Sequence, residues 1–369
     1  MKQHIISLAL IASLAACGSG GNPFDDPAEE ETPGTPTDGE EMGDGEGTGI
    51  NRDGIPPGTV AASPDAALFR SEPEGPDEDS GDGAATGISY NSVDDTFTVD
   101  NLAFDGDRPY DRGTAVSSIA SSASNPNGEF AVYEGPATAV DPVSGDVVNQ
   151  FVYRAVYGVS RNRVRAADGS VTTQPTTQFA IVRTGSYVDY GFGGFIYQRD
   201  TTLTLPNSLQ ATFSGKSGGL RDFNGTGGLQ YTTADVTVDI DFEDFNDGET
   251  IRGDGVKGRI FNRQIFDLDG NDITATVAAS LGENVNEIPD AVFEVGPDVL
   301  DDNGDLITEI QSQLPGSTDT FEEGTFYAIV SGENPDEIVG VFVLEADIET
   351  GTARDTGGFI VYRDPTVQP

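Results

Sequence analysis

The stretch Asp235-Val236-Thr237-Val238-Asp239-Ile240-Asp241-Phe242 has an apolar side chain at every even-numbered position and a polar one at every odd-numbered position. Successive side chains of a β-strand point to opposite faces, so this period of two predicts a strand with one dry face and one wet face. The Asn246-Asp247-Gly248 that follows is typical of a hairpin turn. Arg252, Lys257 and Arg259 come next, and we expect them to pair with the aspartates of the first strand across the ladder.

Short runs rich in β-forming residues, separated by turn residues, fill the chain from about residue 87 onward. The runs lie at residues 96–99, 130–133, 151–157, 179–182, 193–197, 326–330, 338–343 and 357–362. The turns lie at residues 125–128, 144–146, 168–169, 269–270, 303–304 and 332–336. Residues 306–314 suit a short helix or a return strand, and we favour the strand. Many sequential hairpins with one polar face predict a mainly β chain, built as an up-and-down barrel or a sandwich.

The chain has 369 residues and a formal net charge of −44. Nucleic-acid binding needs clusters of Lys and Arg that displace counterions, and the sequence contains no such cluster. We therefore expect no nucleic-acid partner, whereas cations and basic proteins are compatible with this charge. The interpretation that we favour is simpler: a strongly charged surface keeps the protein soluble.

His4 is the only histidine and Cys17 is the only cysteine, and both lie in the N-terminal segment. The rest of the chain therefore has neither an imidazole nor a thiol. Nucleophile systems of the Ser-His-Asp or Cys-His type are excluded, as are zinc, copper and haem sites that need His or Cys ligands. No disulfide can form within the chain, so the core depends on packing alone. We expect no cofactor.

The first 17 residues are typical of a secretory signal, because Lys2 precedes an apolar run that is shorter than the about 20 residues of a membrane-spanning helix. Leu14-Ala15-Ala16-Cys17 resembles the lipobox of bacterial lipoproteins, and Gly18-Ser19-Gly20-Gly21 resembles the tether that follows one. The resemblance implies that Cys17 is lipidated: it carries a diacylglycerol thioether, becomes the N-terminus and is acylated there with a fatty acid such as palmitate. Two or more chains anchor a protein stably.

Gly18 in the second position after cleavage implies sorting to the outer membrane. We expect a lipid-anchored protein there, either on the periplasmic face or at the cell surface. The alternative is an ordinary signal peptide in which Cys17 is coincidental.

Residues 18–85 are rich in Glu, Asp, Gly and Pro. Such a composition buries too little apolar surface to offset the entropy of ordering, so it predicts a disordered acidic linker that spaces the folded part from the membrane. Ala66-Ala67-Leu68-Phe69-Arg70 interrupts this composition. We expect it to dock on the folded part as a short element, and a partner-binding motif is the alternative.

Two acidic loops suggest calcium sites. Residues 267–272 (DLDGND) begin like a calcium-binding loop, but that pattern wants Gly at position six and Glu at position twelve, where this chain has Asp272 and Ala278. Residues 301–305 fail in the same way, with Leu306 and Ser312 at those positions. We interpret both as turns, and a weak calcium site at one of them is a hypothesis.

Tyr187, Tyr190, Phe192 and Phe195 form an aromatic patch interleaved with glycines. Such a patch lines either a ligand-binding face or the protein core, and we favour the core.

Three groups of residues in the second half of the chain combine glycines with aromatic residues at strand ends. They are Gly225-Thr226-Gly227-Gly228-Leu229-Gln230-Tyr231 running into residues 236–242, Gly324-Thr325-Phe326-Tyr327 with the return at 339–342, and Gly357-Gly358-Phe359. In these groups the chain resembles the β-barrel lipoproteins of the transferrin-binding protein B type, and the solute-binding-like proteins grouped with them. Ala328 and Ile329 stand where that family has Gly-Pro. The resemblance implies a soluble barrel of about eight strands preceded by a smaller β "handle" domain. Such proteins hold a protein or a small ligand at the cell surface, and no ligand-contact residue transfers.

These observations predict a signal peptide at residues 1–17, a linker at 18–85, an N-terminal β domain at 86–200 and a barrel domain at 201–369. The predicted function is a non-enzymatic binding module for a protein or small ligand. The alternatives are a structural envelope lipoprotein without a ligand and a hydrolase that uses two carboxylates.

Overall fold

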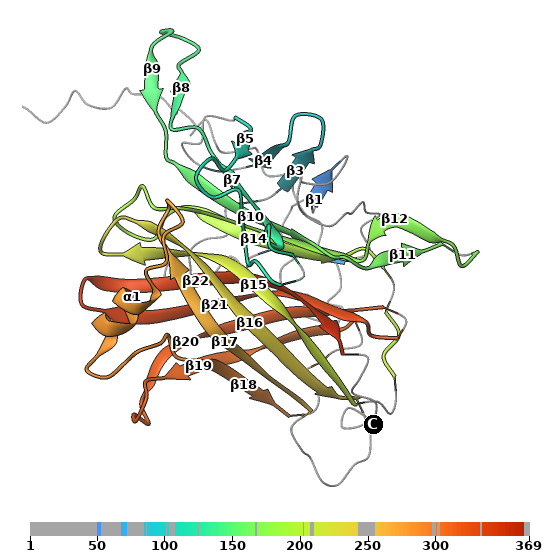
Figure 1. The fold of residues 1–369 in the computed structure, drawn as a ribbon. Coiled ribbons are helices and arrows are strands. Elements are labelled where there is room, and N and C mark those ends of the chain that lie inside the picture. The colour runs from blue at the N-terminus through green and yellow to red at the C-terminus, as the bar shows by residue number, and fades with distance from the viewer. Residues whose placement is uncertain are drawn as a thin grey trace, which may run out of the picture. The chain divides into compact units, whose positions relative to one another are not determined.

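The computed structural model describes residues 50–52, 68–71, 85, 87–100, 102, 108–123, 125–166, 168–201, 203–206, 210–242, 255–296, 300, 303–332 and 334–364. The described chain is mainly β and contains a closed eight-stranded antiparallel barrel and a curled sheet (Figure 1). The predicted fold class is therefore confirmed. No helix of the described residues has the length and apolar character needed to cross a membrane.

The barrel strands follow one another in chain order, each pairing antiparallel with the next, and the last closes on the first. They are β15 (Gln210–Asn224), β16 (Leu229–Asp241), β17 (Val256–Phe266), β18 (Ala291–Val295), β19 (Asp305–Gln313), β20 (Thr320–Ser331), β21 (Glu337–Ile348) and β22 (Gly351–Arg363). The strand that we favoured for residues 306–314 is confirmed by β19.

Burial along the barrel strands explains the two kinds of sequence pattern. In β16, Val236, Val238 and Ile240 are buried in the barrel core, while the residues between them are partly exposed, as the alternation predicts. In β22 both faces are buried: Phe359 belongs to the barrel core, and Ile360 belongs to a cluster shared with the curled sheet. A strand that is covered on both faces therefore has a continuous run of apolar residues in its sequence instead of an alternation.

The curled sheet has the strand order β1-β3-β4-β5-β7-β10-β13-β14-β2, and β6 pairs with β7 beside this path. Its strands are β1 (Ile50–Arg52), β2 (Leu68–Ser71), β3 (Gly87–Asn91), β4 (Thr96–Asp100), β5 (Tyr110–Arg112), β6 (Ser118–Ile119), β7 (Phe130–Glu134), β10 (Tyr153–Val159), β13 (Thr177–Thr184) and β14 (Gly193–Arg199). Two separate hairpins, β8 (Thr138–Val140) with β9 (Val147–Asn149) and β11 (Arg163–Arg165) with β12 (Val171–Pro175), turn where the sequence predicts.

Two short strands lie within the range that composition predicted to be disordered. β2 pairs antiparallel with β14, which confirms docking for residues 68–70, and β1 pairs parallel with β3. The prediction of disorder is wrong at β1, because the sheet edge supplies backbone partners that offset the entropy of ordering a few residues. The rest of residues 18–84 lies outside the described residues.

The sheet packs on the barrel through aromatic rings set against glycines. Phe179 of β13 meets Phe130 edge to face, with ring centroids 5.0 Å apart. A Cβ added at Gly358 of β22 would lie 2.1 Å from Phe179 Cε2, and one added at Gly158 of β10 would lie 2.3 Å from Phe179 Cε1. Glycine at both positions is what allows the ring to fit between the two layers.

A buried carboxylate joins the two parts at another point. Glu337 of β21 accepts hydrogen bonds from the Ser160 hydroxyl at 2.5 Å, from Asn162 Nδ2 at 3.1 Å and from the Thr176 hydroxyl. Burial raises the pKa of Glu337, although the hydroxyl donors Ser160 and Thr176 act in the opposite direction. Polar contacts of this kind fix how the two layers are placed.

One helix, α1 (Thr274–Leu281), was not predicted. The apolar residues Ile273, just before the helix, and Val277 and Leu281 within it lie four apart, which is helical spacing, but the segment is short. It packs on Ile265 of β17 through the buried Ala278. The segment that follows, residues 282–290, brings Pro289 to the polar network described below.

Candidate functional site

A cleft of about 820 Å³ lies between residues 115–128, which include β6, and the outer face of β15, β16 and β17. β6 pairs with β7 over two residues only. The loop that follows is held by its own turn: Ser118 Oγ donates to the Asn127 carbonyl, and Gly128 adopts a positive φ of 97°. This loop therefore forms one wall of the cleft, and the barrel forms the other.

The barrel wall carries charged side chains that are already paired. Lys216 Nζ lies 2.5 Å from Asp235 Oδ1, and Asn262 Nδ2 donates to Asp235 Oδ2 at 2.7 Å. Arg259 donates to Asp290 Oδ2 from both Nε, at 2.7 Å, and Nη2. Partly exposed pairs add little stability, so their main effect here is to hold these polar side chains in fixed positions on the cleft wall.

The predicted cross-strand pairing is only partly right. Lys257 lies opposite Asp239 in the ladder, as expected, but Arg259 lies opposite Thr237 and bonds Asp290 instead. The prediction for Arg259 is wrong because its register partner is not an aspartate, and residues 282–290 bring a carboxylate to it. Arg252 and the turn at residues 246–248 lie outside the described residues.

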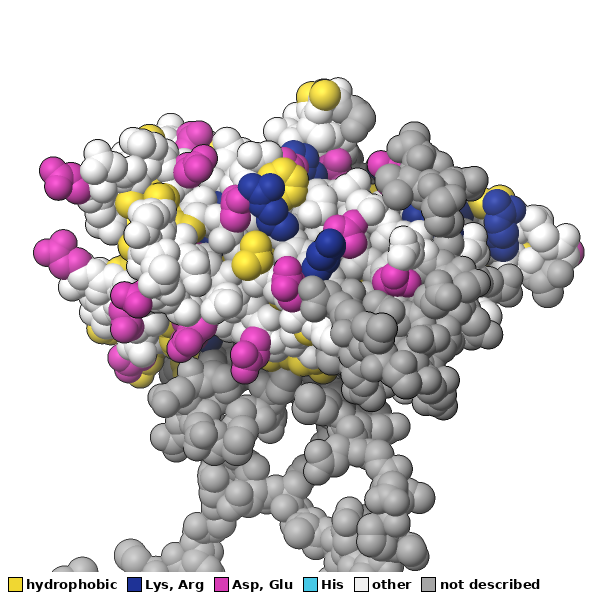
Figure 2. Space-filling view, turned by 90° about the horizontal axis from the view of Figure 1, so that it is seen from below, with side chains coloured by type: hydrophobic (Ala, Val, Ile, Leu, Met, Phe, Trp, Pro, Cys, Tyr) yellow, Lys and Arg dark blue, Asp and Glu magenta, His cyan; other side chains and the backbone are white. Residues whose placement is uncertain are grey.

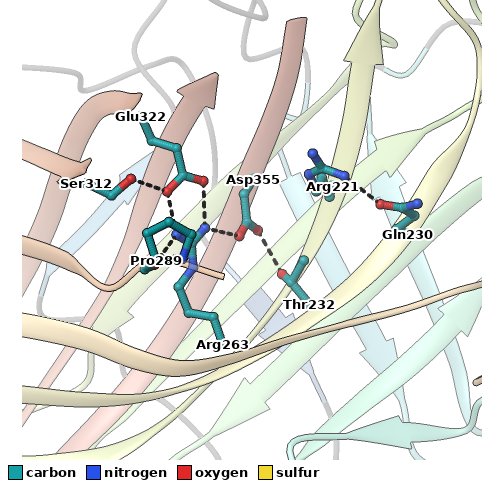
Figure 3. Close-up of polar contacts among 8 residues, drawn as sticks. All are labelled: Arg221, Gln230, Thr232, Arg263, Pro289, Ser312, Glu322 and Asp355. Carbon is teal, nitrogen blue, oxygen red and sulfur yellow. Dashed lines mark hydrogen bonds and ion pairs between the residues drawn. The ribbon is translucent and has the colours of Figure 1, made fainter. Parts of the chain in front are cut away.

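Beneath the cleft lies a buried ionic network centred on Arg263 (Figure 3). A β-bulge, at which Asn262 has a positive φ of 51°, changes the register of β17. Arg263 Nη1 lies 2.5 Å from Glu322 Oε2 and donates to the Pro289 carbonyl at 2.9 Å. Arg263 Nη2 donates to Glu322 Oε1 at 2.9 Å and to Asp355 Oδ2 at 3.1 Å. One guanidinium thus joins β17, β20 and β22.

Neutral donors complete the network. The Ser312 hydroxyl donates to Glu322 at 2.6 Å, and the Thr232 hydroxyl donates to Asp355 at 2.7 Å. Nearby, Arg221 Nη1 donates to Gln230 Oε1 at 2.8 Å. The network is therefore a cross-strand clamp, in which each carboxylate has both a cation and a hydroxyl.

The pKa values of the charged groups in this network result from two opposing effects, burial and pairing with an opposite charge. Burial alone would lower the pKa of Arg263, but Glu322 and Asp355 hold it above its ordinary value. Burial would raise the pKa of Glu322, but Arg263 holds it below its ordinary value. For Asp355 burial dominates, and its pKa is raised despite Arg263. Burial also lowers the pKa of Arg221. Both carboxylates are committed to Arg263, an arrangement suited to holding structure rather than to acid–base chemistry.

The predicted aromatic patch divides between core and surface. Phe195 is fully buried between the sheet and the barrel, as we favoured. The Tyr190 ring lies under the guanidinium of Arg354, 4.1 Å from its centroid. Tyr187 and Phe192 are 43% and 38% exposed. Because both rings are this exposed, the core interpretation is wrong for these two residues. Their ring centroids lie 6.1 and 6.4 Å from that of Phe151. Both residues lie in the loop between β13 and β14, whose carbonyls at Gly185 and Val188 accept hydrogen bonds from Gly228 and Gly225 of the barrel.

The first acidic loop is a turn. Asp267 accepts hydrogen bonds from the backbone N–H of Asp269 and Asn271, and a bridge between Phe266 and Asp272 closes the loop. In the second loop, Gly304 has a positive φ of 84° and Leu300 bridges to Leu306, while residues 301–302 lie outside the described residues. No group of three or more metal-binding side chains occurs among the described residues. Cys17 lies outside them as well.

Sequence reasoning did not single out Arg263, Glu322 or Asp355. A signal was present for one of them, because Asp355 lies four residues before the apolar run Phe359-Ile360-Val361 of the same strand. A charge in such a strand needs a partner. The partner's identity, however, depends on which strands meet in the barrel.

Known protein families and curated proteins give no match to this chain. Solved structures of transferrin-binding protein B are similar to it. A double mutant of the Haemophilus parasuis Hp5 protein has 11% identity and a TM-score of 0.33, covering 74% of this chain and 43% of that one. Intact Ap-TbpB, with N and C lobes, has 12% identity and a TM-score of 0.29, covering 73% and 44%. The chain spans less than half the length of these two proteins. No residue of this chain is assigned a role from them.

Proposed function

We propose that this chain is a lipid-anchored, non-enzymatic binding module of the outer membrane, which holds a protein or small polar ligand in the cleft beside β6. The observation that supports the proposal is the cleft itself. Its charged side chains are held in fixed pairs over a buried ionic network, and such a preorganised site loses little entropy on binding.

The ligand class follows from the lining. Lys216, Asp235 and Arg259 lie on barrel strands, Asp290 comes from the segment before β18, and Ile119 adds an apolar surface on the loop wall. Mixed charges over a small apolar area suit a polar ligand that carries both signs, such as a segment of a protein surface. A single-sign polyanion does not fit this lining.

The first experiment locates ligand contact by photocrosslinking in cells of the producing bacterium. A photoreactive phenylalanine is placed in the full chain at Asn127 or Gln264, two exposed cleft residues, and at Val143 or Glu349 as exposed controls outside it. We expect a discrete adduct at the cleft positions and none at the controls. Native mass spectrometry of the purified protein detects a small ligand that crosslinking misses.

The charge-reversed variant Lys216→Glu with Arg259→Glu tests specificity. We expect the amount of crosslinked adduct, or of ligand-bound protein in the mass spectrum, to fall about tenfold or more. A tenfold change corresponds to about 1.4 kcal/mol of binding free energy. The same adducts at control and cleft positions, or adducts that this variant leaves unchanged, would refute a ligand site in the cleft.

We propose the lipid anchor on the lipobox resemblance and on the short apolar run before Cys17. Mass spectrometry of the mature protein is expected to find an N-terminal residue 17 with a diacylglycerol thioether and an amide-linked acyl chain. Cys17→Ser is expected to move the protein from the membrane fraction to the aqueous fraction, because the acyl chains supply the membrane affinity. A mature chain that starts elsewhere, or a bare Cys17, rules out the anchor.

A further inference from the structure

The barrel wall has a weak seam between β18 and β19. These strands pair at two positions only, Ala291 with Ser312 and Val292 with Gln311. By contrast, β19 pairs with β20 along its whole length. Among the described residues, the other partner on the β18 side of β19 is Leu300, which bridges to Leu306. The backbone of β19 between residues 307 and 310 therefore presents a strand edge inside the barrel wall.

A groove of about 820 Å³ follows this seam. Phe293 and Ile310 line it and also belong to the buried barrel core. Glu294, Glu309 and Glu323 line its exposed sides, and no Lys or Arg is among the described residues that line it. The groove thus combines an apolar floor, carboxylates of one sign and two strand edges.

Charge favours a basic occupant. Figure 2 views the molecule from below Figure 1, the side on which β18 and β19 are drawn, and acidic side chains are spread widely over it. Basic side chains stand near the middle of that face and again toward its right side. A segment with Lys or Arg at alternate positions would direct those side chains to one face, toward the glutamates.

We propose that the seam binds an extended, basic segment of a partner protein as an added β-strand. Unpaired strand edges accept an extended peptide through backbone hydrogen bonds, and alternate side chains supply the specificity. The segment would pair with β19 at residues 307–310 and with β18 at 293–295, with its basic side chains beside Glu294, Glu309 and Glu323. This site is separate from the cleft beside β6.

The test uses the full-length protein and a fluorescein-labelled peptide, Lys-Thr-Lys-Val-Lys-Thr-Lys, read by fluorescence polarisation. We expect saturable binding. A peptide with Pro in place of the central Val keeps every charge but loses a backbone donor and the extended ladder, and we expect it to bind at least tenfold more weakly. A peptide with Glu in place of Lys is expected not to bind.

Matched charge reversals separate the seam from general attraction to an acidic protein. The double variant Glu294→Lys with Glu309→Lys is expected to bind the peptide at least tenfold more weakly. The control variant Glu283→Lys with Glu349→Lys, at exposed sites outside the seam, is expected to change the peptide affinity less than threefold. Hydrogen exchange is expected to slow at residues 293–295 and 307–310 when the peptide binds. The cleft variant Lys216→Glu with Arg259→Glu keeps peptide binding, which separates this proposal from the proposed function.

Three results would overturn the proposal. Equal binding of the proline peptide would exclude strand addition. An equal loss of peptide affinity in the two double variants would show that the peptide responds only to the net charge of the protein. Absence of binding to the unmodified protein would mean that the glutamates guard the strand edge against pairing, a known protective use of charge at sheet edges.

Discussion

Arg263→Met is expected to lower the free energy of unfolding by about 3–5 kcal/mol, because it removes the cation from two buried carboxylates. Glu322 and Asp355 would keep their burial and their hydroxyl donors but lose the guanidinium that compensates both charges. Chemical denaturation followed by circular dichroism measures the change. Tyrosine fluorescence provides a second probe, since the chain has no tryptophan.

Arg259→Met is the matched control. It removes the same side chain from the same strand, but its ion pair with Asp290 is 54% and 36% exposed, so we expect a loss below about 1 kcal/mol. The triple variant Arg263→Met, Glu322→Leu, Asp355→Leu removes all three charges together. It is expected to be clearly more stable than Arg263→Met alone, because most of the single-variant cost comes from uncompensated carboxylates. Equal stability of Arg263→Met and Arg259→Met would show that the network does not hold the barrel.

The contrast between these two arginines shows what the sequence could and could not reveal. The alternation in residues 235–242 is local, so it predicts a strand and the face that is buried. The pairing of Arg259 and Arg263 is not local, because their carboxylate partners come from residues 290, 322 and 355. Strand order and a β-bulge decide those contacts, and neither can be read from one stretch of residues.

The candidate site follows the same rule. From composition alone we could predict that no nucleic acid binds and that no Ser-His-Asp or Cys-His nucleophile occurs beyond residue 17, because His4 and Cys17 are the only histidine and cysteine. The cleft could not be predicted, because it forms between residues 115–128 and strands far later in the chain. The strands β1 and β2 lie in an acidic, Gly-rich part of the sequence. Only the short run at residues 66–70, which contains most of β2, indicated an ordered element there.

Phe179→Ala is expected to destabilise the protein by about 3–5 kcal/mol, since it removes a fully buried ring from the contact between sheet and barrel. The surroundings cannot collapse easily into the space, because the ring stands between Gly158 and Gly358, whose backbones belong to opposite layers. Equilibrium denaturation gives the magnitude. Tyr187→Ala, which truncates a half-exposed ring on the loop between β13 and β14, is the control and is expected to cost far less.

Gly358→Ala tests the same contact from the barrel side. The added methyl group would lie 2.1 Å from Phe179 Cε2, and the ring cannot retreat because Gly158 and Phe130 hold its other side. Overpacking of this kind costs about 1–3 kcal/mol. In the Phe179→Ala background the methyl group has space, so Gly358→Ala should become nearly neutral or stabilising. The double-mutant cycle therefore carries a coupling energy of at least about 1 kcal/mol. Additive costs would mean that the sheet and the barrel do not meet through this ring, and that the interface is held by its polar contacts, such as those of Glu337, instead.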